Sequence, residues 1–208
     1  MFTIGHGTRT TEELAGLLRA AGAARVIDVR RYPASRRHPH FSRQELERSL
    51  PALGVAYEWR GEELGGRRTR RDSDGAGPGP GPGPGPTRHP AWRNASFGAY
   101  ADHMDSPAFR DALEELFGNA AEEEPAAIMC AETLWWRCHR RLIADALVVA
   151  GCEVVHILDE RTRQRHELHP NARVDEHGRP VYDVGVQRAL LDRTPETVRS
   201  SGTTPPKR

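Results

Sequence analysis

The sequence predicts a single three-layer α/β domain with a mainly parallel, Rossmann-like sheet of about five strands. Short apolar runs alternate with amphipathic stretches over residues 1–160, which is the pattern of strands joined by helices. The chain of 208 residues leaves room for one domain of about 150 residues beside a low-complexity insert and a polar tail. No stretch approaches the roughly 18 apolar residues that span a membrane, so we expect no membrane partner.

Strands and helices are expected to alternate in the order βαβαβ at the start of the chain. Strand candidates lie at residues 2–5, 26–30, 55–57, 126–129 and 152–158. Helix candidates lie at residues 11–21, 43–53, 97–104, 108–117 and 136–150. Thr10 or Thr11 is suited to cap the first helix and Ser42 the second, while Gly22 and Gly54 end them.

Two segments stand apart from this pattern. The α/β domain at 1–160 is interrupted by a Gly/Pro-rich loop at 72–90, whose near-alternation of Gly and Pro is typical of a solvated, disordered segment. Residues 161–208 are a polar C-terminal extension, which we expect to be partly disordered, with one short extended piece at 181–182.

Composition and net charge exclude few classes of function. The net charge is +1, and of the 30 basic residues only Lys207 is lysine, which a GC-rich genome explains as well as any ligand does. Three cysteines and the absence of a recognisable export signal favour a cytoplasmic protein with reduced thiols.

The stretch from Ala126 to Ala144 is the first candidate for a site, because it reads as strand, polar turn and helix. Cys138 and His139 stand where the helix should begin, which would lower the pKa of the thiol and activate it as a nucleophile. Cys130 is the alternative nucleophile, with Glu132 as acid or base. The competing interpretation is that both cysteines only fill space in the core.

An anion site is predicted beside these thiols. His6, Arg30 and Arg140 each flank a predicted element on the same edge of the sheet, and Gly65 and Gly66 would let a ligand approach the backbone. The alternative for Arg30 is a structural ion pair with Asp28 or Glu132.

No metal site is expected, because the seven-residue gap between Cys130 and Cys138 matches no usual zinc knuckle. Adjacent Cys and His also rarely bind one ion. A phosphatase-like loop is excluded as well, since the residue six after Cys130 is Trp136 and the arginine follows it at Arg137.

Several of these motifs together resemble the uncharacterised family known as domain of unknown function 488. The resemblance spans roughly residues 1–160 and implies a compact α/β domain, but it implies no established reaction. Trp135 stands where the family is expected to have a proline. The matching pieces are Thr3-Ile4-Gly5-His6, Asp28-Val29-Arg30 with Pro33 and Ser35, Leu64-Gly65-Gly66, Tyr100 with Met104, and Cys130-Ala131-Glu132 followed by Cys138-His139-Arg140 and Ile143-Ala144.

Three functional hypotheses follow from the sequence. The first is a small cytoplasmic enzyme that binds an anionic substrate, of which a nucleotide is one class, and carries a reactive cysteine. The second is a rhodanese-like sulfur transferase, by analogy of strand pattern alone. The third is a non-catalytic nucleic-acid-binding module built on the arginine-rich loops. No cofactor and no oligomeric state is indicated.

Overall fold

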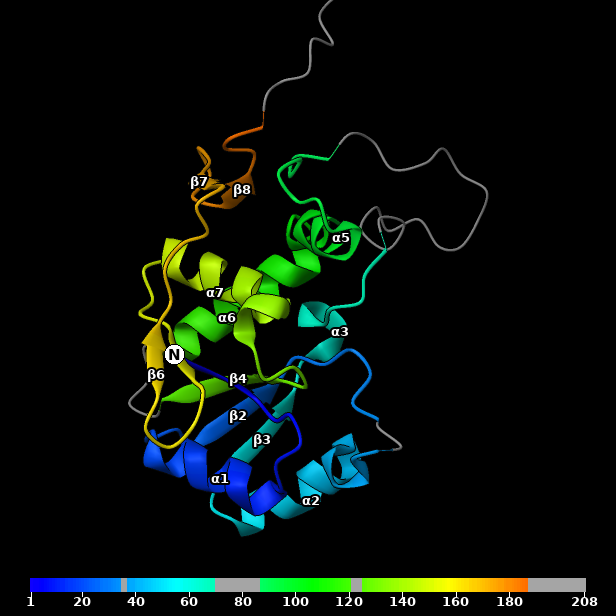
Figure 1. Ribbon diagram of the computed structural model, residues 1–208, viewed down its shortest axis with the longest axis vertical. Coiled ribbons are helices and arrows are strands. Elements are labelled where there is room, and N and C mark those ends of the chain that lie inside the picture. Colours follow the sequence, from blue (N-terminus) through cyan, green and yellow to red (C-terminus); the bar gives the residue numbers. More distant parts are fainter. Residues whose placement is uncertain (35–36, 70–86, 121–124, 187–208) are drawn as a thin grey trace, which may run out of the picture.

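A six-stranded sheet with helices on both faces forms the centre of the molecule (Figure 1), which confirms the predicted α/β class. The computed structural model describes residues 1–34, 37–69, 87–120 and 125–186. The strand order is β3-β2-β4-β1-β5-β6; all neighbours are parallel except β5 and β6, which are antiparallel. A separate antiparallel pair, β7 and β8, lies beyond helix α7 (Figure 1).

The bounds of the elements are as follows. The strands are β1 (Phe2–Gly5), β2 (Arg25–Asp28), β3 (Ala56–Trp59), β4 (Ala126–Cys130), β5 (Val155–Ile157), β6 (Arg163–Arg165), β7 (Ala172–Val174) and β8 (Pro180–Tyr182). The helices are α1 (Thr11–Ala20), α2 (Arg43–Ala52), α3 (Gly61–Leu64), α5 (Ala95–Met104), α6 (Pro107–Ala120) and α7 (Arg140–Val149), with 3₁₀ turns η1 (Pro39–Phe41) and η2 (Trp135–Arg137).

The predicted helix caps are confirmed. Thr10 and Glu13 form a capping box at α1, in which each side chain accepts a hydrogen bond from the backbone N–H of the other. Ser42 caps α2 in the same sense. The helix predicted over 136–150 is shorter than expected, because η2 forms a separate turn and Cys138 is extended, with φ −122° and ψ 149°. Cys138 and His139 therefore precede α7.

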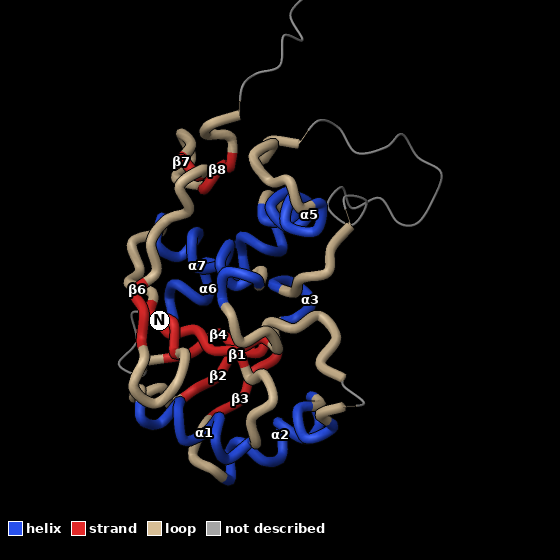
Figure 2. The backbone as a smooth tube through the Cα atoms, viewed as in Figure 1, coloured by secondary structure: helices blue, strands red, loops and turns tan. Residues whose placement is uncertain are grey.

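Alternation along the strands divides the core between the two faces of the sheet (Figure 2). On one face Val26 and Met129 pack under α1 and α2. On the other face Ile27, Ile128 and Cys130 pack under α5, α6 and α7. Because Cys130 has the same parity as Ile128, its thiol lies on the face that α7 covers.

The described residues after 160, up to 186, continue this fold. Strand β6 adds to the edge of the sheet, and the extended piece expected at 181–182 is β8. Tyr182 is fully buried in the core that contains α7. At the end of the predicted disordered loop, His89 is buried and its Nδ1 accepts the Tyr182 N–H at 3.3 Å. The remainder of that loop and the end of the extension, residues 72–86 and 187–208, lie outside the described residues.

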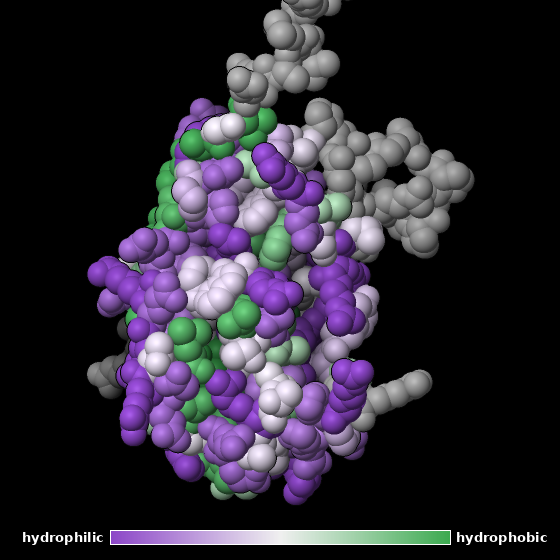
Figure 3. Space-filling view, in the orientation of Figure 1, coloured by the Kyte–Doolittle hydropathy of each residue, from purple (hydrophilic) through white to green (hydrophobic). Residues whose placement is uncertain are grey.

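Hydrophilic residues cover much of the face shown in Figure 3. Among the described residues, no helix has the length and apolar character needed to cross a bilayer.

Candidate functional site

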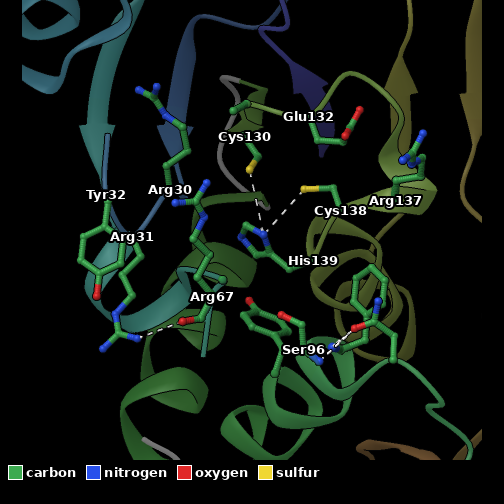
Figure 4. Close-up of a pocket in the computed structure, with 15 residues that line it drawn as sticks. Arg30, Arg31, Tyr32, Arg67, Ser96, Cys130, Glu132, Arg137, Cys138 and His139 are labelled. Carbon is green, nitrogen blue, oxygen red and sulfur yellow. Dashed lines mark hydrogen bonds between the residues drawn. The ribbon is translucent and has the colours of Figure 1, made fainter. Parts of the chain in front are cut away.

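Two thiols and one imidazole meet at the carboxyl end of β4. The sulfurs of Cys130 and Cys138 and one ring nitrogen of His139 all lie within 4.8 Å of one another. The Nδ1 atom of His139 is 3.6 Å from the Cys138 sulfur and 4.0 Å from the Cys130 sulfur (Figure 4). We call these three residues the thiol–imidazole cluster.

The fold explains why residues nine positions apart in sequence come together. Strand alternation directs the Cys130 side chain towards the layer of α7. The chain then passes through η2, and the extended residue Cys138 brings it back beside Cys130. His139 is the N-cap residue of α7, with its ring turned back towards the sheet. Cys130 is 9% exposed and Cys138 5%, so both thiols are nearly withdrawn from solvent.

A backbone carbonyl sets the orientation and tautomer of His139. Its Nε2 lies 3.1 Å from the carbonyl oxygen of Val29 and donates to it, since a carbonyl can only accept. In the neutral ring Nδ1 then carries the lone pair, and this nitrogen faces both thiols. The cluster is thus arranged for proton transfer from a cysteine to His139.

Gly66 is required for the position of this ring. A Cβ at Gly66 would lie 2.6 Å from Nδ1 of His139, which is too close for any real contact. The loop that carries Gly66 is itself fixed, because the buried Tyr100 hydroxyl donates to the Leu64 carbonyl at 2.7 Å. The sequence pattern Gly65-Gly66 therefore serves close packing against His139, and Gly66 also lines the pocket described below.

The two thiols differ in acidity. Burial by itself raises the pKa of Cys138, but its hydrogen bond with Cys130 and the charge and hydrogen bond of His139 outweigh burial and hold this pKa well below the usual value. The hydrogen bond to Cys138, followed by burial, raises the pKa of Cys130 well above the usual value. These surroundings favour the thiolate form at Cys138 and disfavour it at Cys130.

The cluster forms one wall of a pocket of about 360 Å³, a size typical of small-ligand sites. Arg31, Arg67 and Arg137 also line it, against the single carboxylate Glu132. Tyr32, which is 60% exposed, adds an aromatic ring, and the Arg31 guanidinium lies 5.4 Å from that ring. An excess of arginine favours anions in such a cavity.

Arg30 lines the same pocket but is engaged in an ion pair. Its Nε and Nη2 donate to the two carboxylate oxygens of Asp28 at 2.8 and 2.5 Å, and Asp28 is fully buried. The alternative weighed from sequence, a structural ion pair with Asp28, is thus present. Nη1 of Arg30 donates to Nε2 of His6 at 3.1 Å. Burial and the charge of Arg30 lower the pKa of His6 to about 3, so His6 is neutral at physiological pH. His6 also lies outside the pocket lining.

Arg140 and Glu132 also differ from their expected places. Arg140 is 1% exposed and donates to the carbonyls of Glu132 and Thr133, so it stabilises the loop after Cys130 from the protein interior. It does not line the pocket. The carboxylate of Glu132 lies at the pocket edge and accepts the Leu134 N–H at 3.1 Å. Gly65, like Arg140, lies outside the pocket lining.

A buried hydrogen-bond chain supports Arg140 from the far side. Arg140 donates to the Thr3 hydroxyl at 3.4 Å, and that hydroxyl lies 2.7 Å from Nδ1 of His156. His156 and His166 are joined at 2.9 Å, and Nε2 of His166 donates to the Asp145 carboxylate at 2.9 Å. The carboxylate can only accept, so Nε2 of His166 donates at this end of the chain, and the guanidinium of Arg140 can only donate at the other end.

Sequence reasoning did not assign the arginines of the pocket wall. Arg31 and Arg67 belong to the arginine-rich loops of the nucleic-acid-binding hypothesis, and Arg137 entered only as an arginine misplaced for a phosphatase loop. Arg31 directly follows Arg30, and Arg67 directly follows Gly66, so adjacency to predicted site residues was the available signal. The aromatic lining from Tyr32 and Phe97 carried no comparable signal.

Comparison with known proteins identifies one family. The model of the family described as "Domain of unknown function DUF488" matches residues 10–147, a range that contains the thiol–imidazole cluster and most of its supports. Neither the curated proteins nor the solved structures contain a match to this chain.

Proposed function

The chain belongs to the DUF488 family, and we propose that it is an enzyme that binds a small anionic substrate and attacks it with the Cys138 thiolate. The observation that carries this proposal is the position of the Cys138–His139 pair, 3.6 Å apart, on the wall of an arginine-lined pocket. A thiol next to a base that a third group orients is the arrangement that nucleophilic catalysis requires.

The proposed chemistry uses groups already in contact. Nδ1 of His139 takes the proton of the Cys138 thiol, and the carbonyl of Val29 keeps the opposite nitrogen protonated. The thiolate then forms a bond to an electrophilic centre of the substrate, the bond from that centre to its leaving group breaks, and the leaving group takes the proton from Nδ1 of His139. The negative charge of the substrate faces Arg31, Arg67 and Arg137. Because the reaction needs a reduced thiol, we place the protein in the cytoplasm.

A nucleotide is the anionic class that the pocket suits best. Phosphate oxygens match the planar donors of the pocket arginines, while the exposed ring of Tyr32 offers a surface on which a base can stack. The volume of about 360 Å³ is sufficient for a ligand of that size.

Alkylation with a charged and an uncharged reagent tests both halves of the proposal. Iodoacetate and iodoacetamide are applied to the native protein in buffer with EDTA, and the modified cysteines are followed by peptide mass spectrometry. Cys138 should react with iodoacetamide at least about tenfold faster than Cys152, whose pKa burial raises. Iodoacetate should be further favoured at Cys138 alone, and salt should reduce this preference.

Two variants separate the thiolate from the anion site. His139→Asn should abolish the rapid reaction with both reagents. Arg137→Gln should lower only the preference for iodoacetate, because Arg137 lines the pocket and is exposed, so its loss removes a charge without disturbing buried packing. Equal rates at Cys138 and Cys152 in the native protein would refute the reactive thiol. A rapid reaction without any preference for iodoacetate would refute the anion site.

A further inference from the structure

The thiol–imidazole cluster has the composition of a binding site for a thiophilic metal ion. Two sulfurs and one imidazole nitrogen form a ligand set that suits Zn²⁺ and excludes Mg²⁺ and Ca²⁺, which require oxygen ligands. The sequence spacing argued against such a site, because Cys138 and His139 are adjacent. In the folded chain the extended backbone of Cys138 nevertheless places its sulfur and Nδ1 of His139 only 3.6 Å apart.

The distances fit a tetrahedral ion. Zinc lies about 2.3 Å from sulfur and about 2.05 Å from nitrogen, so a tetrahedron has sulfur–nitrogen edges of about 3.6 Å and a sulfur–sulfur edge of about 3.8 Å. The two sulfur–nitrogen distances to His139 are 3.6 and 4.0 Å, and all three atoms lie within 4.8 Å. The distance to the Cys138 sulfur equals the ideal edge, and the distance to the Cys130 sulfur exceeds it by about 0.4 Å.

The surroundings of His139 match those of a metal ligand. A ligating histidine normally donates its other ring N–H to a carbonyl or carboxylate, which fixes the tautomer. Nε2 of His139 donates to the Val29 carbonyl, so Nδ1 is free to coordinate. Gly66 leaves the space that the ring needs. The nearby His6 is not a fourth ligand, because Arg30 donates to its Nε2 and its Nδ1 donates to the Gly7 carbonyl.

We propose that Cys130, Cys138 and His139 bind a zinc ion through three protein ligands, with the fourth coordination position facing the pocket. All three residues line the pocket, so the open position is directed at the space where an anion would lie. Three protein ligands with one open position distinguish exchangeable or catalytic zinc sites from closed structural ones. A bound ion would occupy the Cys138 sulfur and Nδ1 of His139, so it would protect this thiol from alkylation and block its proposed attack on a substrate while the ion is bound.

Metal binding is tested directly, without any assay of enzyme activity. The reduced full-length protein is titrated with Co²⁺, then with Zn²⁺ in competition with a chromophoric chelator. One equivalent of Co²⁺ should give the intense visible bands of a tetrahedral ion and a sulfur-to-cobalt charge-transfer band. Zn²⁺ should displace it stoichiometrically.

Four variants complete the test. Cys130→Ser, Cys138→Ser and His139→Asn should each weaken Zn²⁺ binding by about 100-fold or more, while Cys152→Ser, the matched change outside the cluster, should leave it unchanged. Circular dichroism before titration identifies any variant that has not folded, and the Co²⁺ spectrum of the wild-type protein then decides alone. Absence of the charge-transfer band, or Zn²⁺ affinity unaffected by all three cluster variants, would overturn the proposal.

The outcomes for metal and for nucleophile are separable. The alkylation experiment uses EDTA and reports the thiolate without an ion, whereas the Co²⁺ titration reports coordination whatever the reactivity of Cys138. Zinc binding together with slow alkylation in EDTA would support the metal site and refute the nucleophile. Rapid alkylation in EDTA without metal binding would give the opposite result.

Discussion

Substitution of Gly66 by alanine tests whether the position of His139 depends on close packing. The added Cβ would lie 2.6 Å from Nδ1 and 2.9 Å from Cγ of His139, and ordinary contacts begin near 3.4 Å. Either the ring or the loop must therefore move by about 0.8 Å. The loop is held by the Tyr100 hydroxyl on the Leu64 carbonyl, and the ring is held by the Val29 carbonyl, so neither gives way freely.

The sign of the stability change separates the two possible outcomes. Without a clash, Gly→Ala in a loop stabilises a protein by about 0.4–1 kcal/mol, because the unfolded chain loses freedom. Overpacking costs about 1–3 kcal/mol, and loss of the hydrogen bond from His139 to Val29 costs about 1 kcal/mol more. We therefore expect Gly66→Ala to destabilise the protein by about 1–3 kcal/mol and to slow alkylation of Cys138 at least about tenfold.

Urea unfolding and the alkylation rate of Cys138 are measured on the same preparations. The control is Gly16→Ala in helix α1, where a Cβ meets nothing within 4 Å, so it should stabilise the helix by about 1 kcal/mol and leave the thiol unaffected. The reasoning is refuted if Gly66→Ala stabilises the protein as Gly16→Ala does and Cys138 remains fully reactive.

Asp145→Asn should lower the free energy of unfolding by about 3 kcal/mol, because it removes a buried carboxylate that accepts three hydrogen bonds. Tyr182→Phe removes only one of these bonds and should cost about 1 kcal/mol. Equal losses of the two variants in urea unfolding would contradict the network. Burial and the charge of His166 lower the pKa of His156 to about 3 in the folded state, against 6.5 in the unfolded chain. The stability that this group contributes is therefore fully present above about pH 6.5 and is lost as the pH falls towards 3. Between about pH 7 and 4.5, His156→Gln should lose less stability than the wild-type protein in urea unfolding. Identical losses would show that His156 does not titrate as stated. Arg30→Ala should destabilise by about 3–5 kcal/mol, since it leaves the buried Asp28 carboxylate without its ion partner, and an unchanged melting temperature would instead assign Arg30 to ligand binding alone.

The sequence by itself determined the fold class, the helix caps and the stretch that carries the site. Apolar runs with a period of two and stripes with a period of 3.6 are local signals, so strands and helices could be recognised without tertiary information. The box formed by Thr10 and Glu13 and the cap at Ser42 are equally local. The sequence also shows that Cys130 lies on the same face of its strand as Ile128, because side chains alternate along a strand. It does not show which helices cover that face.

The functions of individual polar residues were decided only by the tertiary structure. Arg30 and Arg140 stand beside the predicted site in sequence, yet Asp28 and the loop carbonyls after Cys130 engage their guanidinium groups. Which partner a charged side chain meets depends on contacts between distant segments, and sequence spacing does not report them. The pocket arginines Arg31 and Arg67 lie on such segments.

The meeting of Cys130, Cys138 and His139 illustrates the same limit most clearly. Spacing rules for zinc sites describe ligands carried by one tight loop, and these residues match no such rule. Here the three side chains come from the end of β4 and from the two residues before α7, and the parallel sheet brings these segments to one edge. The sequence supplied the donor atoms, and the packing of α7 against the sheet placed them within reach of one another, because burial of that helix fixes where its first residues lie.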